Sequence, residues 1–468
     1  MATHIKAARA TGTGAADRPE RQPFSGYYTA SQPEPDNDLT RTGPGTPCGE
    51  YMRRYWQPIA ILEELPPDNR PYALNVLGEE LVLFKDLSGH WGLLHAHCAH
   101  RQASLEFGIV CDHGIRCCYH GWQFDVDGTL LYAGAEPENS PLFKRVRQGA
   151  YPVQEYKGIL FAYMGPPDHK PDFPIYDTFT LPDVEAKPYS IDMPCNWLQI
   201  GENVVDPYHT VFLHTRVSGT QFSDAFAQLP HVEWFEMPSG SGLYLFNVRR
   251  VQDNLWIRVQ EAIRPNFSQT GDIWQDPKTE KIFNRVGLSK WMTPMTDTTT
   301  KVIGWRWFGE HLDSSGKADW DSVGRNKIDF EGQTEQRTYE ERQKRPGDYE
   351  AIASQGPITL HKKENLGMSD GGVALYRRLL RRNIQMLQDG EPLPEPVRNG
   401  DGTLATYSQD TVLRVPPANE DDKGKRVEIA RNVARFVVES DTLAPAARTA
   451  EIRRRILEEL GIPVSAGA

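Results

Sequence analysis

The stretch HCAHRQASLEFGIVCDHGIRCCYHGW, His97 to Trp122, determines how the rest of this sequence is interpreted. It holds four of the six cysteines and four of the thirteen histidines in a chain of 468 residues. One end carries Cys98-Ala-His100, a C-x-H pair, and the other carries Cys117-Cys118-Tyr119-His120, which contains a C-x-x-H pair. Cysteines clustered beside histidines indicate metal ligation rather than disulfide bonding.

Each of the two pairs offers one thiolate and one imidazole. Two short loops at hairpin tips of a β-domain can bring the pairs together around a binuclear iron cluster, with both cysteines on one iron and both histidines on the other. Replacing two thiolates by neutral imidazoles lowers the negative charge around the cluster and raises its reduction potential. A tetrahedral zinc site accepts the same four ligands, so it is the alternative that the residues leave open.

The composition is that of an ordinary globular chain, with 39% hydrophobic and 25% charged residues. A net charge of −11 argues against a nucleic-acid partner, which would favour a basic face. No apolar run approaches the roughly 20 residues that span a bilayer, and the first residues lack the apolar core of a secretory signal. We therefore expect a cytoplasmic protein that binds neither nucleic acid nor membrane.

The chain divides into three regions. Residues 1–47 are rich in Gly, Pro, Thr and Asp without apolar periodicity, which predicts an irregular N-terminal arm. Residues 48–165 alternate short apolar runs with Gly-Glu, Ser-Gly and Asp-Gly turn signals, which predicts a β-domain of hairpins. A Pro-rich linker begins at the end of this region. Residues 166–468 mix aromatic and β-branched runs with helical patterns, which predicts an α+β domain with a large antiparallel sheet and C-terminal helices.

A second group of ligand-type residues lies in GENVVDPYHTVFLH, residues 201–214. Two histidines and one carboxylate on one face of an iron leave positions free for O2. Asp206 and His209 lie about 60° apart around a helix and can share a hydrogen bond. His209 and His214 lie about 140° apart on an ideal helix, so joint ligation needs a bend or a π-like widening. The alternative is an amphipathic helix with incidental histidines.

Both groups closely resemble motifs of one family. CAHRQASLEFG (98–108) and IRCCYHGWQFDVDG (115–128) resemble the Rieske [2Fe-2S] domain of ring-hydroxylating oxygenases, and the match covers about residues 50–165. The D-x2-H-x4-H spacing at 206–214 resembles the box that follows this domain in the family. The resemblance implies an N-terminal all-β Rieske domain and an α+β catalytic domain of the helix-grip (START-like) type.

The same resemblance implies the ligand sets of two iron centres. A [2Fe-2S] cluster would be held by Cys98, His100, Cys117 and His120, and a mononuclear Fe(II) by His209 and His214. The family usually has Pro at the position of Cys118, and we interpret this residue and Cys111 as structural rather than as ligands.

The third ligand of the mononuclear iron has to come from far along the chain, and the candidate carboxylates are Asp329, Asp348, Glu364 and Asp370. The segment SQGPITLHKKENLGMSDGGVALYRRLLRRNI resembles the helical region that carries the carboxylate in the phthalate-dioxygenase-like branch. The matching position is Asp370, in the first turn of an amphipathic helix, and we predict it as the ligand. An acid that complements the helix dipole is the alternative.

The resemblance also implies partners and a working cycle. A separate reductase would pass electrons from NADH or NADPH to the Rieske cluster, and O2 would be activated at the Fe(II). Subunits would form a head-to-tail homotrimer in which Asp206 bridges His120 of one subunit to His209 of the next. Asn203 would line the iron site. The alternative for Asp206 is that it only caps or orients its own helix.

The expected substrate is an aromatic acid, which would be hydroxylated or O-demethylated, with aromatic cis-dihydroxylation as the alternative. Arg216 or Arg250 could pair with a substrate carboxylate, although a solvated surface arginine is the commoner role. A Rieske electron-transfer protein with a non-catalytic second domain is the alternative from another functional class. The iron and sulfide content distinguishes it from an oxygenase.

Overall fold

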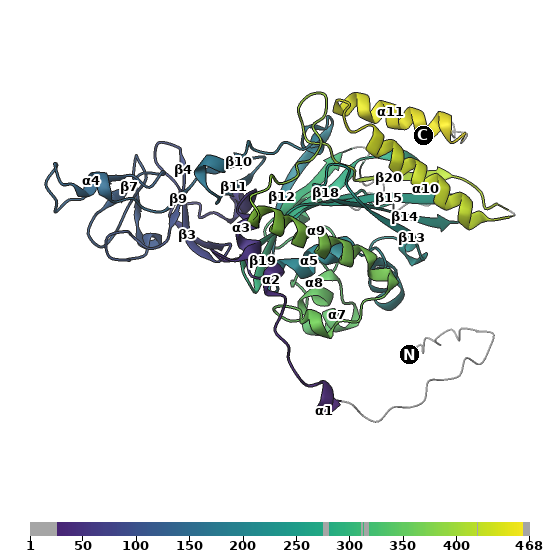
Figure 1. Ribbon diagram of the computed structural model, residues 1–468, viewed down its shortest axis with the longest axis horizontal. Coiled ribbons are helices and arrows are strands. Elements are labelled where there is room, and N and C mark those ends of the chain that lie inside the picture. Colours follow the sequence, from purple (N-terminus) through teal and green to yellow (C-terminus); the bar gives the residue numbers. More distant parts are fainter. Residues whose placement is uncertain (1–25, 275–279, 310–311, 313–317, 419, 462–468) are drawn as a thin grey trace.

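The computed structural model describes residues 26–274, 280–309, 312, 318–418 and 420–461 (Figure 1). Most of the arm predicted for residues 1–47 lies outside these ranges. The described end of that arm is mostly without regular structure, but it contains two single helical turns, α1 (Gly26–Thr29) and α2 (Asn37–Thr40), before α3 (Pro47–Met52). Leu39 of α2 is fully buried, and its carbonyl accepts a hydrogen bond from Trp197 Nε1 at 3.1 Å. The end of the arm therefore packs into the core of the second region.

The N-terminal region consists of small antiparallel sheets and lies to the left in Figure 1. One sheet has the order β1 (Trp56–Ile61), β11 (Ile159–Tyr163), β10 (Val153–Tyr156). A second has the order β2 (Tyr72–Val76), β3 (Glu79–Lys85), β4 (Trp91–His95), β9 (Ala150–Tyr151). A third has the order β5 (Ile109–Val110), β6 (Ile115–Arg116), β7 (Gln123–Phe124), β8 (Leu130–Tyr132), followed in the chain by α4 (Leu142–Arg145).

The β2–β3–β4 meander is the one that the turn signals predict. Leu77 and Gly78 connect β2 to β3 with φ of 49° and 75°. Both values lie in the left-handed region that a tight two-residue hairpin turn requires, and Gly78 adopts it without steric cost.

The second region is built on a large antiparallel sheet, and this confirms the predicted fold class. Its strands run in the order β12 (Val184–Met193), β19 (Thr299–Gly309), β18 (Val286–Thr296), β16 (Phe267–Gly271), β15 (Asn254–Ile263), β14 (Gly242–Val251), β13 (His231–Glu236). β20 (Gln409–Arg414) adds to β15 and also pairs with β17 (Lys281–Asn284).

Helices lie beside this sheet and come before or after its strands in the chain (Figure 1). They are α5 (Trp197–Val204), α6 (His209–Val211), the π-helix η5 (Phe212–Val217), α7 (Tyr339–Lys344), α8 (Asp348–Ala353), α9 (Gly371–Gln388), α10 (Asp422–Glu439) and α11 (Pro445–Glu459). α9 and α10 contact β14, and α11 contacts β17. The described helices include none with the length and apolar character that a membrane crossing demands.

Short 3-10 turns complete the connections. Their bounds are η1 (Leu62–Glu64), η2 (Leu105–Phe107), η3 (Pro167–His169), η4 (Asp177–Thr180), η6 (Asp224–Ala227), η7 (Trp320–Ser322), η8 (His361–Lys363) and η9 (Met368–Asp370).

Two hydrophobic clusters position the functional loops. A small core beneath the Cys/His loops includes Phe84, Leu94, Ile115 and Phe124. A larger cluster is shared by the two regions and joins Leu160 of β11 to buried residues of the large sheet and of α5. Because close-packed apolar cores are nearly incompressible, this shared cluster fixes the N-terminal sheets against the second domain.

Candidate metal centres and substrate cavity

Two neighbouring loops carry the predicted ligands of the first centre. Cys98 and His100 follow β4, and Cys117 and His120 lie between β6 and β7. A backbone hydrogen bond closes each loop: Cys98 N donates to Ala103 O at 2.9 Å, and Cys117 N donates to Trp122 O at 2.8 Å. The local pairing of short strands therefore presents one C-x-H and one C-x-x-H group side by side.

The thiols and imidazoles of these loops face opposite ways. Cys98 and Cys117 are 1% and 4% exposed, whereas His120 is exposed and His100 is partly exposed. The two imidazole ring centroids lie 4.6 Å apart, and His100 stacks on Trp122 with centroids 4.3 Å apart. Burial, reinforced by the neighbouring thiol of Cys117, raises the pKa of Cys98 to about 11, so a bound cation would be needed to keep this residue as a thiolate. This donor set fits a [2Fe-2S] cluster, which the two buried thiols and the two more exposed imidazoles would hold.

The second group of predicted residues spans α5, a break and two further helical turns. α5 carries Asn203 near its C-terminal end. The helical structure is interrupted at Asp206 and Pro207, and α6 starts at His209. η5 then winds as a π-helix from Phe212, and it carries His214. For joint ligation, the spacing of five residues between the histidines required a bend or such a widening. The π-turn brings the two ring centroids to 5.2 Å from each other.

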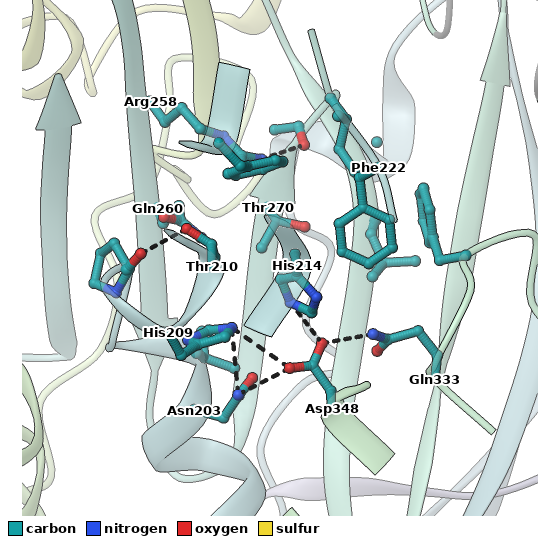
Figure 2. Close-up of a pocket in the computed structure, with 18 of the residues that line it drawn as sticks. Asn203, His209, Thr210, His214, Phe222, Arg258, Gln260, Thr270, Gln333 and Asp348 are labelled. Atoms are coloured by element: carbon teal, nitrogen blue, oxygen red, sulfur yellow. Dashed lines mark hydrogen bonds and ion pairs between the residues drawn. The ribbon is translucent and has the colours of Figure 1, made fainter. Parts of the chain in front are cut away.

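The carboxylate that meets both histidines belongs to Asp348. Its Oδ1 lies 3.4 Å from His209 Nε2 and its Oδ2 lies 3.3 Å from His214 Nε2 (Figure 2). One ligand atom from each of the three residues lies within 4.8 Å of the others. Burial alone would raise the pKa of Asp348, but the adjacent imidazoles of His214 and His209 hold it well below its usual range.

The prediction of Asp370 at this position is therefore corrected. Asp370 ends the 3-10 turn η9, and its Oδ2 accepts a hydrogen bond from Gly367 N at 2.6 Å. The neighbouring Met368 is 98% exposed, so this turn lies at the surface. Asp370 and Asp348 both lie at the start of a helix. Asp370, before α9, is hydrogen-bonded to the backbone of its own turn, whereas Asp348, in α8, contacts both histidines.

Packing of α5 against the segment that contains α8 explains why Asp348 reaches the site. Gln199 Nε2 donates to the carbonyls of Ile352 at 3.2 Å and Gly356 at 3.1 Å. In front of α8, a Cβ on Gly347 would lie only 2.3 Å from Gly332 Cα. A side chain at position 347 would therefore push apart two backbone segments that hold Asp348 in place.

The remaining ring nitrogens of both histidines have partners outside the triad. Nδ1 of His209 is hydrogen-bonded to the backbone carbonyl of Asp206, and Nδ1 of His214 lies 2.8 Å from Gln221 Oε1. When the imidazoles are neutral, as metal ligation requires, this arrangement favours hydrogen on Nδ1 and leaves each Nε2 lone pair directed at the Asp348 side. Metal-binding histidines in proteins are typically held in this way by a second partner. The donor set fits a divalent iron with two imidazoles and one carboxylate.

Asn203 and Asp206 lie next to this triad. Asn203 Nδ2 donates to Asp348 Oδ1 at 3.2 Å and lies 3.4 Å from His209 Nε2. Asp206 accepts a hydrogen bond from Tyr208 N at 2.9 Å, and its Oδ2 lies 3.7 Å from His209 Nδ1. The Asp206 side chain is 28% exposed, so part of its carboxylate faces outward.

A cavity of about 110 Å³ adjoins the triad. Its walls include all three triad residues and Asn203, together with apolar side chains from several elements: Phe222, Phe226, Leu288 and Phe330. Charged side chains also reach it, among them Arg258, Lys290 and Arg306. The cavity thus combines apolar walls and a few polar groups next to candidate iron ligands, which is typical of small-molecule sites.

The other residues that the sequence singled out lie away from this cavity. Arg250 forms an ion pair with Asp422, and exposed Arg216 donates to the carbonyl of Ala227 at 2.8 Å, so neither lines the cavity. Cys111 and Cys118 are free thiols; Cys118 is exposed and Cys111 is partly exposed. The sequence analysis did not single out Lys290, because a lone lysine in a strand carries no motif.

Comparisons with known proteins bear on the Rieske-like loops and on the family of the whole chain. The family description "Rieske [2Fe-2S] domain" matches residues 55–155. The tert-butanol monooxygenase/tert-amyl alcohol desaturase oxygenase subunit of Aquincola tertiaricarbonis is 42% identical over 441 residues, which cover 90% of this chain and 92% of that protein. The alpha subunit of phenoxybenzoate dioxygenase from Ectopseudomonas oleovorans is 38% identical over 383 residues, which cover 76% of this chain and 86% of the relative.

Solved structures share the fold at lower identity. NdmA of Pseudomonas putida CBB5 with caffeine aligns with a TM-score of 0.56 and 21% identity, over 73% of this chain and 93% of that one. With sequence relatives that cover nearly the whole chain and a Rieske domain in front of an antiparallel catalytic domain, this protein belongs to the Rieske non-haem iron ring-hydroxylating oxygenases, as an oxygenase alpha subunit of the phthalate-dioxygenase-like branch.

Proposed function

We propose that this oxygenase receives electrons from a separate NAD(P)H-dependent reductase and hydroxylates or O-demethylates an aromatic acid at a mononuclear Fe(II). The observation that carries the proposal is the convergence of His209, His214 and Asp348 beside an apolar cavity. When bound there, Fe(II) would offer open positions to O2, and a [2Fe-2S] cluster on the Cys/His loops would supply electrons one at a time.

Each residue of the triad contributes a defined part. His209 and His214 would present Nε2 to the metal because their Nδ1 atoms are engaged by Asp206 O and Gln221. Asp348 would supply the negative charge, and Asn203 would orient it through the hydrogen bond to Oδ1. The cavity walls, including Phe222 and Phe330, would hold an aromatic ring by apolar contact and limit the water around it.

We further propose the head-to-tail trimer, in which the cluster of one subunit serves the iron of its neighbour. Figure 1 shows β7, which follows the His120 loop, at the far end of the N-terminal region, whereas α5 and α8 lie within the catalytic domain. Large apolar side chains are exposed at both places: Phe107, Ile109 and Tyr119 around the cluster loops, and Phe212 and Val217 on the π-helix. Exposed apolar groups at two separated surfaces suit contact between different surfaces of successive subunits. Asp206 would then connect His209 to the partner's His120.

Substrate-dependent O2 uptake tests the proposed reaction. Metal-loaded protein with a reductase and NADH or NADPH is supplied with 3-phenoxybenzoate or 3-methoxybenzoate, and products are identified by mass. O2 uptake that depends on the acid, with one added oxygen or with formaldehyde release, is expected. A product with two added hydroxyl groups would show that the reaction is cis-dihydroxylation and not the proposed one.

A second candidate substrate class is a tertiary alcohol. It is favoured by the 42% identity to an oxygenase subunit named for tert-butanol and tert-amyl alcohol. The same assay with tert-butanol separates the two. O2 uptake with tert-butanol and none with either acid would select the alcohol.

A further inference from the structure

The charged side chains around the cavity are almost all paired, and Lys290 is the exception. Arg258 pairs with Asp410 at 2.9 Å and Arg306 pairs with Asp329 at 3.1 Å. Lys290 lies on the central strand β18 and lines both this cavity and a smaller one beside it. Within the described part of the chain, its ammonium has no hydrogen bond and no ion pair. Lys290 is partly exposed, and an ammonium that borders a cavity without a protein partner is available to an anionic ligand.

The nearby carboxylate whose charge acts on Lys290 is that of Asp348, and its oxygens already have other partners. Burial lowers the pKa of Lys290, and the charge of Asp348 opposes that effect. The two oxygens of Asp348 face His209 and His214, and Asp348 also accepts hydrogen bonds from Asn203 and Gln333. With a divalent cation on the triad, its charge would be offset there, so it would not compensate the lysine.

We infer that Lys290 is the anion anchor of the substrate cavity: its ammonium binds the carboxylate of the substrate while the apolar walls hold the rest of the molecule. This inference rests on the proposed function and adds the residue that selects an acid over a neutral compound. A substrate carboxylate supplies the missing charge, and a charge-assisted hydrogen bond inside a cavity is strong and directional. Lys290 is therefore a specificity-determining residue.

Benzoate and benzamide are the probes that isolate this charge, because they have nearly the same shape. Their dissociation constants for the iron-loaded protein are measured by calorimetry. Wild-type protein is expected to bind benzoate about tenfold or more tightly than benzamide, and Lys290→Met is expected to weaken benzoate binding about 10- to 100-fold. Benzamide binding should change less than about twofold. The control Lys327→Met removes an exposed lysine outside the cavity and should leave both constants unchanged.

Two further readings keep the test decisive. Lys290→Met should keep the wild-type iron content. Its melting temperature should be equal to or higher than that of the wild type, because methionine removes an unpaired charge and is an unbranched side chain of similar length. Benzoate should raise the melting temperature of the wild type and not that of the variant. If Lys290→Met binds benzoate as tightly as the wild type, the carboxylate is held elsewhere, including directly on iron, and the inference is overturned.

The outcome is separable from that of the proposed reaction. Lys290-dependent benzoate binding without acid-dependent O2 uptake would remove the proposed reaction and retain the anion site. Acid-dependent O2 uptake that is unchanged in Lys290→Met would retain the reaction and remove the anchor.

Discussion

At the residue scale, Asp348 presents one carboxylate oxygen to each of two imidazoles, and Asp370 presents its carboxylate to the backbone of its own turn. We therefore expect Asp348→Ala to lose about one iron per chain and at least about 100-fold in turnover, because two imidazoles alone leave the divalent site without its anionic ligand. Iron content and the visible spectrum of the cluster are the measurements. Asp370→Ala is the matched control and should keep both iron and turnover. Loss of iron in Asp370→Ala with retention in Asp348→Ala would contradict this assignment.

A second residue-scale prediction concerns acid stability of the N-terminal region. Burial would raise the pKa of Glu79, but hydrogen bonds from His95, Tyr151 and Arg53 outweigh it and lower that pKa to about 2. An unfolded glutamate titrates near 4.3, so the stabilisation is complete above that pH and is lost as the pH falls toward 2. In urea titrations, Glu79→Gln should be on the order of 1–2 kcal/mol less stable than the wild type at pH 6, with partial exposure discounted.

The same comparison has a defined limit at low pH. The stability difference between wild type and Glu79→Gln should shrink steadily between pH 4.5 and pH 2 (about the unfolded and folded pKa values). A difference that is constant over this range would show that the charge of Glu79 contributes nothing.

Residue chemistry could be predicted from the sequence wherever the partners are local. Cys98 with His100, and Cys117 with His120, lie within a few residues of each other, so the spacing alone indicated the cluster loops. Asp348 and Asp370 both start helices, and nothing in their own segments separates them. What separates them is long-range packing of Gln199 against the segment after α8, and the sequence does not show it.

At the element scale, a buried ion pair holds α11 to the turn η4, and further hydrogen bonds tie it to α10 and to the segment before β20. Arg448 is fully buried and donates to Asp177 Oδ2 at 2.6 Å and to the carbonyls of Thr406 and Val437 at 2.7 and 2.9 Å. Arg448→Ala should cost about 3–5 kcal/mol of unfolding free energy, because it leaves Asp177 with a buried charge that Arg285 alone must compensate. Urea denaturation measures it. Arg454→Ala, an exposed pair on the same helix, is the control and should barely change stability.

The type of an element could be predicted where an apolar pattern extends over many residues. The amphipathic helix that the sequence predicts around Asp370 is α9, and its buried residues include Val373, Tyr376, Leu380 and Ile384. The spacing of the two histidines left a bend and a π-like widening as alternatives, because residues five apart cannot face one metal from an ideal helix. The structure has the π-helix η5. The arm before α3 was harder, because short turns such as α2 are stabilised by contacts such as that of Trp197 with Leu39 O rather than by local pattern.

At the scale of the whole molecule, each active unit of the proposed trimer combines the Rieske cluster of one chain with the mononuclear iron of its neighbour. A variant without the cluster (His100→Ala) and a variant without the mononuclear iron (His214→Ala) should each be inactive alone. Co-expressed in equal amounts, they should regain roughly a quarter of wild-type turnover, because in a head-to-tail ring one junction in four joins an intact cluster to an intact iron site. No recovery in mixed oligomers of confirmed mass would show that electrons pass within one chain.

The central claim is that this single chain carries a Rieske cluster and a separate iron site made by His209, His214 and Asp348. Iron and acid-labile sulfide per chain, measured on fully loaded protein, test it most directly. The account predicts about three irons and two sulfides, with the Rieske visible spectrum. Equal amounts of iron and sulfide, or zinc in place of iron, would contradict it.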